Sequence, residues 1–146
     1  MVKSIECNLE FLRQKSKELT TQKEVDSIIK DLEDTLDTLK GYGLAAIQIG
    51  NNKQIAIVRM DKCKVNLINP KIVSKEDKFV FRGEGCLSFP ELKIDTDRYL
   101  YITIESGLEG QRNKYALEGL ESIVVLHEID HLNGITILDR KHRRKK

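Results

Sequence analysis

One apolar stretch decides how this chain folds: residues 122–134 read SIVVLHEIDHLNG. We expect it to form most of a helix that runs from about Leu117 to Asn133 and is capped by Gly134. Apolar residues occupy nearly every side of this helix, which is typical of a helix buried in a protein core. Any polar group on it therefore needs a partner inside the protein.

The two histidines of this stretch, His127 and His131, are four positions apart, so both imidazoles lie on one face of the helix. Two imidazoles at this spacing can bind one metal ion, and Glu128 beside them can accept a proton from water. The alternative is a pair of histidines that only hydrogen-bond within the core. The sequence favours a metal site, because two of the 3 histidines lie on this apolar helix.

A catalytic metal site needs a third protein ligand and an open position. The HExxHxxGxxH pattern of many metalloproteases is incomplete here, because Ile137 replaces its last histidine. No glutamate follows His131, which excludes the proteases with a downstream glutamate ligand. The third ligand must therefore lie upstream, where Cys86 stands in the segment GEGCLSFP (residues 83–90); a thiolate is a strong ligand for zinc or ferrous iron.

The rest of the chain predicts one more long helix and several short strands. Apolar residues at helical spacing indicate an amphipathic helix from about Lys23 to Lys40, with a capping box at its start. Between Gly50 and about Ala116 we expect short strands rich in β-branched residues, including 54–60, 65–69, 78–81, 92–94 and 98–105. Short strands separated by turns indicate antiparallel sheets.

Length and composition fit one globular domain that works in the cytoplasm. The chain has 146 residues, 40% hydrophobic and 33% charged, and no apolar run long enough to cross a bilayer. The net charge of +2 is uneven, because residues 140–146 are almost all basic. That tail is either a solvated end or a transient contact with an RNA-rich surface; the chain is not basic enough for a dedicated nucleic-acid-binding domain.

Three segments, taken together, resemble the peptide deformylases. GYGLAAIQ at residues 41–48, EGCLS at 84–88 and HEIDH at 127–131 match the GxGxAAxQ, EGCLS and HExDH segments of that family, in the same order. The resemblance implies an α+β fold, with antiparallel β-sheets packed around the central buried C-terminal helix and an N-terminal amphipathic helix beside them. It implies one catalytic domain over residues 1–139 and a basic tail over 140–146, a compact form that resembles phage-encoded members.

The resemblance also implies the function, the removal of the N-terminal formyl group from formyl-methionyl nascent polypeptides with release of formate. It implies that one divalent metal ion is bound by Cys86, His127 and His131. That ion is expected to be Fe²⁺, which Zn²⁺, Ni²⁺ or Co²⁺ can replace. Glu128 is then the general base that takes a proton from water. The side-chain amide of Gln48 and the backbone N–H of Leu87 are expected to stabilise the oxyanion.

Substrate contacts follow from the same resemblance. The peptide is expected to lie extended along the backbone of Tyr42, Gly43 and Gly85, with the methionine side chain in an apolar pocket near Tyr42. Arg98 either orients the peptide or pairs with an acid, and Asp130 is expected to fix the ligand geometry through a partner not identified from sequence.

The expected partners are formylated nascent peptides and, transiently, a ribosome reached through the basic tail. We expect no membrane and no sequence-specific nucleic acid as partner, and cytoplasmic location (the host cytoplasm if the protein is phage-encoded). Two other functions stay open at this stage. One is a metallohydrolase acting on a different small amide, and the other is a non-catalytic metal-binding or ribosome-docking protein with the same fold.

Overall fold

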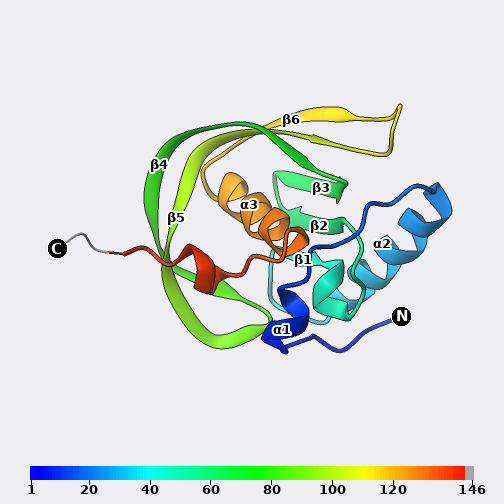
Figure 1. Ribbon diagram of the computed structural model, residues 1–146, viewed down its shortest axis with the longest axis horizontal. Helices are drawn as coiled ribbons and strands as arrows, with labels where there is room; N and C mark the ends of the chain where they lie inside the picture. Colours follow the sequence, from blue (N-terminus) through cyan, green and yellow to red (C-terminus); the bar gives the residue numbers. More distant parts are fainter. Residues whose placement is uncertain (144–146) are drawn as a thin grey trace.

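The computed structural model of the protein describes residues 1–143, in which a buried helix lies between two sheets and a second long helix packs on the outer face of one sheet (Figure 1). In chain order the elements are α1 (Leu9–Leu12), α2 (Gln22–Leu36), β1 (Gly43–Ala45), the 3₁₀ helix η1 (Ala46–Ile49), β2 (Ile55–Met60), β3 (Cys63–Ile68), β4 (Lys71–Cys86), β5 (Phe89–Ser106), β6 (Asn113–Glu118), α3 (Leu120–Leu132) and the 3₁₀ helix η2 (Ile137–Arg140).

The two sheets are antiparallel throughout, and each has three strands, in the orders β1-β2-β3 and β4-β5-β6. The α+β fold with antiparallel sheets around a C-terminal helix is thus confirmed. The expected short strands are in part wrong, because residues 71–86 and 89–106 form two long strands. The first half of β4 is exposed to solvent, so its polar side chains need no buried partners and the strand continues through them.

Helix α3 lies in the centre, as its composition predicts: 10 of its 13 residues are buried. It begins at Leu120, later than expected, because Leu117 and Glu118 belong to β6 and the chain turns at Gly119, where φ is +62°. It ends where expected, with Asn133 as the cap and Gly134 in the left-handed region at φ +75°.

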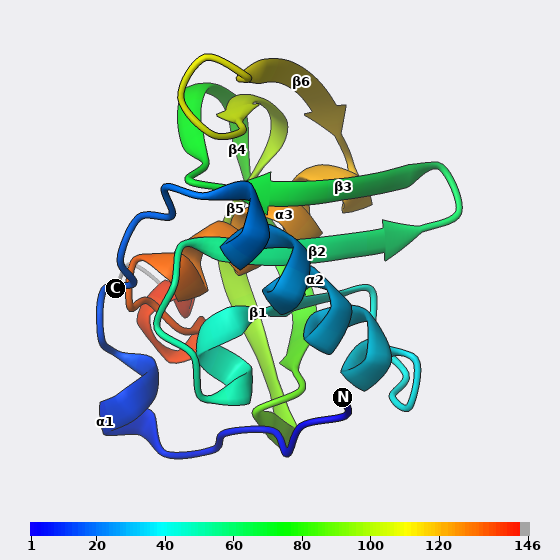
Figure 2. The same cartoon turned by 90° about the vertical axis from the view of Figure 1, so that its right-hand side faces the viewer.

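The sheet β1-β2-β3 separates two hydrophobic clusters, because successive side chains of a strand point to opposite faces. Ala56 and Val58 of β2 pack with α3, whereas Ile55 and Ile57 pack with the apolar stripe of α2. Figure 2 shows α2 lying against this sheet. The hydroxyl of Thr21 accepts a hydrogen bond from the backbone of Glu24, so the N-terminal cap predicted for α2 is present.

The end of the described chain is attached to the body. Arg140 bonds to Asp130 of α3, and His142 bonds to Asp97 of β5 at 2.8 Å between Nδ1 and Oδ1. The contacts therefore continue beyond residue 139, where we expected the tail to begin; residues 144–146 of that tail lie outside the described range. None of the helices within residues 1–143 is both long and apolar enough to cross a membrane.

Candidate metal centre

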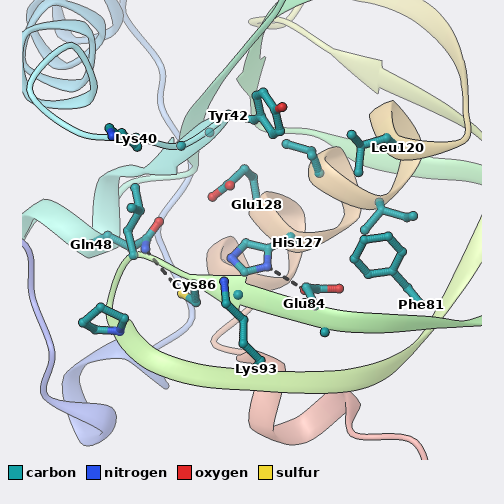
Figure 3. Close-up of a pocket in the computed structure, with 18 residues that line it drawn as sticks. Lys40, Tyr42, Gln48, Phe81, Glu84, Cys86, Lys93, Leu120, His127 and Glu128 are labelled. Carbon is teal, nitrogen blue, oxygen red and sulfur yellow. Dashed lines mark hydrogen bonds and ion pairs between the residues drawn. The ribbon is translucent and has the colours of Figure 1, made fainter.

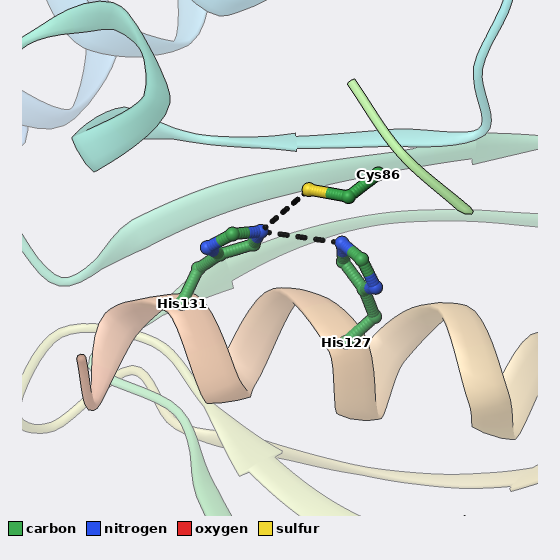
Figure 4. A group of neighbouring side chains, drawn as sticks. All are labelled: Cys86, His127 and His131. Carbon is green, nitrogen blue, oxygen red and sulfur yellow. Dashed lines mark hydrogen bonds between the residues drawn. The ribbon is translucent and has the colours of Figure 1, made fainter. Parts of the chain in front are cut away.

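The side chains of Cys86, His127 and His131 meet at one point in the core (Figure 4). The Nε2 atoms of the two histidines are 3.2 Å apart, and the Sγ atom of Cys86 lies 3.4 Å from Nε2 of His131. All three residues are buried, and their ligand atoms lie within 4.8 Å of one another. The cysteine and the histidines come from segments about 40 residues apart, so the fold itself assembles this cluster.

Two local features bring these ligands together. The four-residue spacing on α3 stacks the two imidazoles on one face of the helix. Cys86 ends β4 at the tight turn into β5, where it pairs with Phe89. The pairing of β4 with β5 shifts register on both sides of Glu84, and such bulges bend a strand and re-aim its side chains. The irregular end of β4 thereby directs the Cys86 thiol towards α3.

The cluster has the geometry that a divalent metal ion requires. Nitrogen and sulfur ligands at about 2.0–2.3 Å from one tetrahedral ion lie roughly 3.3–3.6 Å apart. The distances of 3.2 and 3.4 Å in this structure are close to that range. A thiolate and two imidazoles also form a donor set that suits Zn²⁺ or Fe²⁺. These residues therefore fit a divalent metal ion with three protein ligands.

Glu84 orients the first histidine, and sequence reasoning missed this role. Its Oε2 atom accepts a hydrogen bond of 2.7 Å from Nδ1 of His127, which leaves Nε2 free to face the cluster centre. Thr96 donates a further hydrogen bond to the same carboxylate. Burial by itself would raise the pKa of Glu84, but the hydrogen bonds from His127 and Arg98 lower it to about 2, so the carboxylate is ionised. In the sequence, the only signal for this role was the position of Glu84 between two glycines, two residues before Cys86.

Arg98 lies between two acids and is only 2% exposed. Its Nε and Nη2 atoms contact the two carboxylate oxygens of Glu84 at 2.8 and 2.6 Å, and its Nη1 atom lies 2.6 Å from Asp130. Asp130 also accepts two hydrogen bonds from Arg140, at 3.0 and 2.9 Å. Arg98 does not line the pocket beside the cluster, so the structure shows the second of its two expected roles, pairing with an acid. The same contacts identify the partners of Asp130.

Glu128 points into a pocket beside the metal ligands, and its carboxylate lacks hydrogen-bond partners there within the described chain (Figure 3). Its Oε1 atom is buried without a hydrogen-bond partner in the described chain. Burial raises the pKa of this carboxyl group to about 7. A Cβ atom on Gly43 would lie 2.6 Å from Oε2 of Glu128 and 3.0 Å from the carbonyl oxygen of Ile57. The glycine at position 43 therefore leaves the space that the Glu128 carboxylate occupies.

Gln48 lies on the other side of the cluster and is 1% exposed. Its amide nitrogen donates to the Ser88 hydroxyl at 3.1 Å and faces the Cys86 sulfur at 3.7 Å. Its amide oxygen accepts the backbone N–H of Ala45 at 3.0 Å. These contacts hold the amide of Gln48 at the edge of the pocket, next to Cys86.

The pocket has a volume of about 730 Å³ and joins these groups to the surface. Part of its wall is apolar and comes from Phe81, Leu120, Ile123 and Val124. Of the ten site residues expected from sequence, eight line it; Arg98 and His131 lie behind it. The eight are Tyr42, Gly43, Gln48, Gly85, Cys86, Leu87, His127 and Glu128.

Comparison with known proteins gives a consistent result. The family model described as polypeptide deformylase matches residues 3–146. Peptide deformylase from Aquifex aeolicus is 39% identical over 125 residues, which cover 81% of this chain and 73% of that protein. The one from Desulforudis audaxviator is 38% identical over 133 residues, covering 89% of this chain and 86% of that protein.

Solved structures agree with the sequence relatives. The crystal structure of peptide deformylase from Thermotoga maritima superposes with a TM-score of 0.90 at 31% identity, covering 98% of this chain and 99% of that one. The Synechococcus elongatus peptide deformylase in complex with actinonin gives a TM-score of 0.88 at 32% identity, covering 98% of this chain and 80% of that one. The chain therefore belongs to the polypeptide deformylase family of metal-dependent, formyl-removing hydrolases.

Proposed function

We propose that this chain hydrolyses the formyl group from the N-terminal methionine of nascent polypeptides, with Cys86, His127 and His131 as the metal ligands. One observation carries the proposal: the three ligand atoms lie within 4.8 Å of one another, next to the Glu128 carboxylate on the pocket wall. An unpaired carboxylate beside an open pocket favours catalysis over a non-catalytic metal site, which has no need of a base.

Glu128 acts as the general base and then as the general acid. When bound, the metal ion would polarise the formyl group and lower the pKa of water beside it. Glu128 takes the proton as water adds to the formyl carbon, and its pKa of about 7 suits this transfer at neutral pH. The same carboxyl group then gives the proton to the amine as the C–N bond breaks. Formate and a free N-terminus result.

The oxyanion that develops in this reaction needs hydrogen-bond donors. We assign the side-chain amide of Gln48 and the backbone N–H of Leu87 to this role, because both residues line the pocket beside Cys86. The contacts of Gln48 with Ser88 and Ala45 hold its amide in place before substrate arrives. We propose Fe²⁺ as the metal ion of the working enzyme, with Zn²⁺, Ni²⁺ or Co²⁺ as substitutes.

The substrate is proposed to enter as an extended strand between the backbones of Tyr42, Gly43 and Gly85, which lie on the pocket wall. The apolar wall that contains Phe81 and Val124 would accept the methionine side chain. Tyr42, at 54% exposure, stands at the rim of this pocket.

We propose one catalytic domain over residues 1–139, which works in the cytoplasm and contacts the ribosome through the basic tail over residues 140–146. Arg140 and His142 are bound to the body of the protein. Residues 143–146 are all Lys or Arg, and residues 144–146 lie outside the described range. Ribosomal RNA would attract them by charge alone.

The first test is the Glu128→Ala variant. We expect formate release from a formyl-methionyl peptide to fall by at least about 10²-fold, because the general base is lost. Metal content, measured on anaerobically purified protein, should stay the same because the three ligands are intact. Glu121→Ala, on the same helix but off the pocket, is the matched control. Full activity of Glu128→Ala, or equal hydrolysis of acetyl- and formyl-methionyl peptides, would contradict the proposal.

The Gly43→Ala variant tests whether Glu128 needs the space that the absence of a side chain at Gly43 leaves for its carboxylate. The added Cβ would meet Glu128 Oε2 and the Ile57 carbonyl oxygen, so we expect kcat/KM to fall about 10–100-fold with the metal retained. Gly41→Ala is the control, since the atoms nearest to its Cβ would be those of the Leu87 side chain, the closest at 3.1 Å. Equal losses in the two variants would show that contact with Glu128 is not the cause.

The Glu84→Gln variant tests the orientation of His127. Loss of the charged acceptor should weaken metal binding about 10–100-fold, which a competition titration with a chelator would measure. Glu91→Gln removes the same charge from an exposed position and should leave metal affinity unchanged. Wild-type affinity in Glu84→Gln would mean that this hydrogen bond does not position the ligand.

A variant truncated after residue 142 tests the ribosome contact. It keeps Arg140 and His142 but loses four cations, so we expect it to co-sediment with ribosomes less than the full chain at low salt. The binding of the full chain should weaken as salt is raised. Co-sedimentation that is insensitive to both salt and truncation would refute this role of the tail.

A further inference from the structure

The rim of the substrate pocket carries two positive charges that the reaction does not use. Lys40 follows α2 and Lys93 lies on β5, and both line the pocket with exposed side chains (Figure 3). Neither ammonium group makes an ion pair with a carboxylate within residues 1–143. Both are therefore available to an incoming ligand.

No exposed acid balances these charges among the residues that line the pocket. Its two acidic residues are Glu84 and Glu128, and both are buried. Glu84 is neutralised by Arg98 and is bonded to His127, while Glu128 points at the reacting centre. The two exposed charged residues that line the pocket are therefore both cationic.

The two lysines stand on different walls, close to the proposed path of the peptide. The Nζ atom of Lys93 lies over the backbone of Gly85, only 2.6 Å from the place where a Cβ on that residue would be. Lys40 directly precedes the segment of Gly41 and Tyr42 on the other wall. In an extended peptide, successive side chains point to opposite sides. Two consecutive substrate residues could thus each face one lysine.

We propose that Lys40 and Lys93, the lysine rim, select formylated peptides with Asp or Glu at the second or third position and disfavour Lys or Arg there. The inference rests on the proposed function and adds a substrate class to it. The chemistry recognised is a carboxylate carried by the peptide side chain, and the selection acts on approach and binding. Bond breaking at the formyl carbon involves neither lysine.

The test compares kcat/KM for formate release from C-terminally amidated formyl-methionyl tripeptides with Glu or Lys at the second or third position. Amidation removes the terminal carboxylate, which would otherwise bind the lysine rim itself. For a partly exposed charge contact we expect a preference for Glu over Lys of about five- to tenfold at low salt. The preference should decline towards one as ionic strength approaches 1 M, because the charges are screened.

Three variants assign the effect to these residues. The Glu-to-Lys ratio of kcat/KM within each variant is the readout, so a general loss of activity cancels. Lys40→Gln and Lys93→Gln should each reduce the ratio at one of the two positions, and the double variant should bring both ratios close to one. Lys114→Gln, an exposed lysine of β6 off the pocket, should keep the wild-type ratios.

Equal rates for the Glu and Lys peptides in the wild type, or a preference that survives the double substitution, would overturn this inference but not the proposed function. Weaker inhibition by added formate in the double variant, without a peptide preference in the wild type, would also overturn it, because the lysines would then hold the product. Failure of every formylated peptide to release formate would instead contradict the proposed function, and the inference with it.

Discussion

The buried guanidinium of Arg98, clamped between the carboxylates of Glu84 and Asp130, is the interaction on which the rest of the site depends. A charge at 2% exposure is tolerated only when it is paired and hydrogen-bonded, and here two acids satisfy its donors. Because Glu84 lies on β4 and Asp130 lies on α3, this cluster joins the sheet β4-β5-β6 to the central helix. Removing Arg98 would leave the buried Glu84 carboxylate without its countercharge, which is strongly destabilising.

The same cluster connects the fold to the metal ligands. Each carboxylate oxygen of Glu84 accepts a hydrogen bond from Arg98, and Oε2 also accepts one from His127. The guanidinium therefore holds the carboxylate that orients the imidazole of His127. On the far side, Arg140 holds Asp130 from the end of the chain. The orientation of His127 therefore depends on contacts that extend from β4 to η2.

Sequence reasoning recovered the parts of this site that depend on local spacing. The HExxH pattern placed both histidines on one face of α3, and composition predicted that this helix is buried. The need for a third ligand upstream of the histidines pointed to Cys86, and the resemblance then assigned it to the metal, since spacing alone cannot relate a strand end to a helix about 40 residues later. The role of Glu84 was missed, and the role of Arg98 was left open, for the same physical reason. Their partners lie 14 to 43 residues away, and the register shifts that aim Glu84 at His127 leave no periodic signal.

Two of the three buried side-chain polar atoms that lack a partner within residues 1–143 lie at this site, and they point to the same conclusion about function. Buried polar groups are almost always hydrogen-bonded, yet Oε1 of Glu128 and Nδ1 of His131 have no partner within the described chain. Close packing of Gly43 against Glu128 holds the unpaired carboxylate at the pocket wall, and burial raises its pKa towards neutrality. Had this core evolved for stability alone, a paired or apolar residue would serve better at position 128. In the proposed mechanism, the missing partner leaves the Glu128 carboxylate free to exchange a proton with water and then with the departing amine.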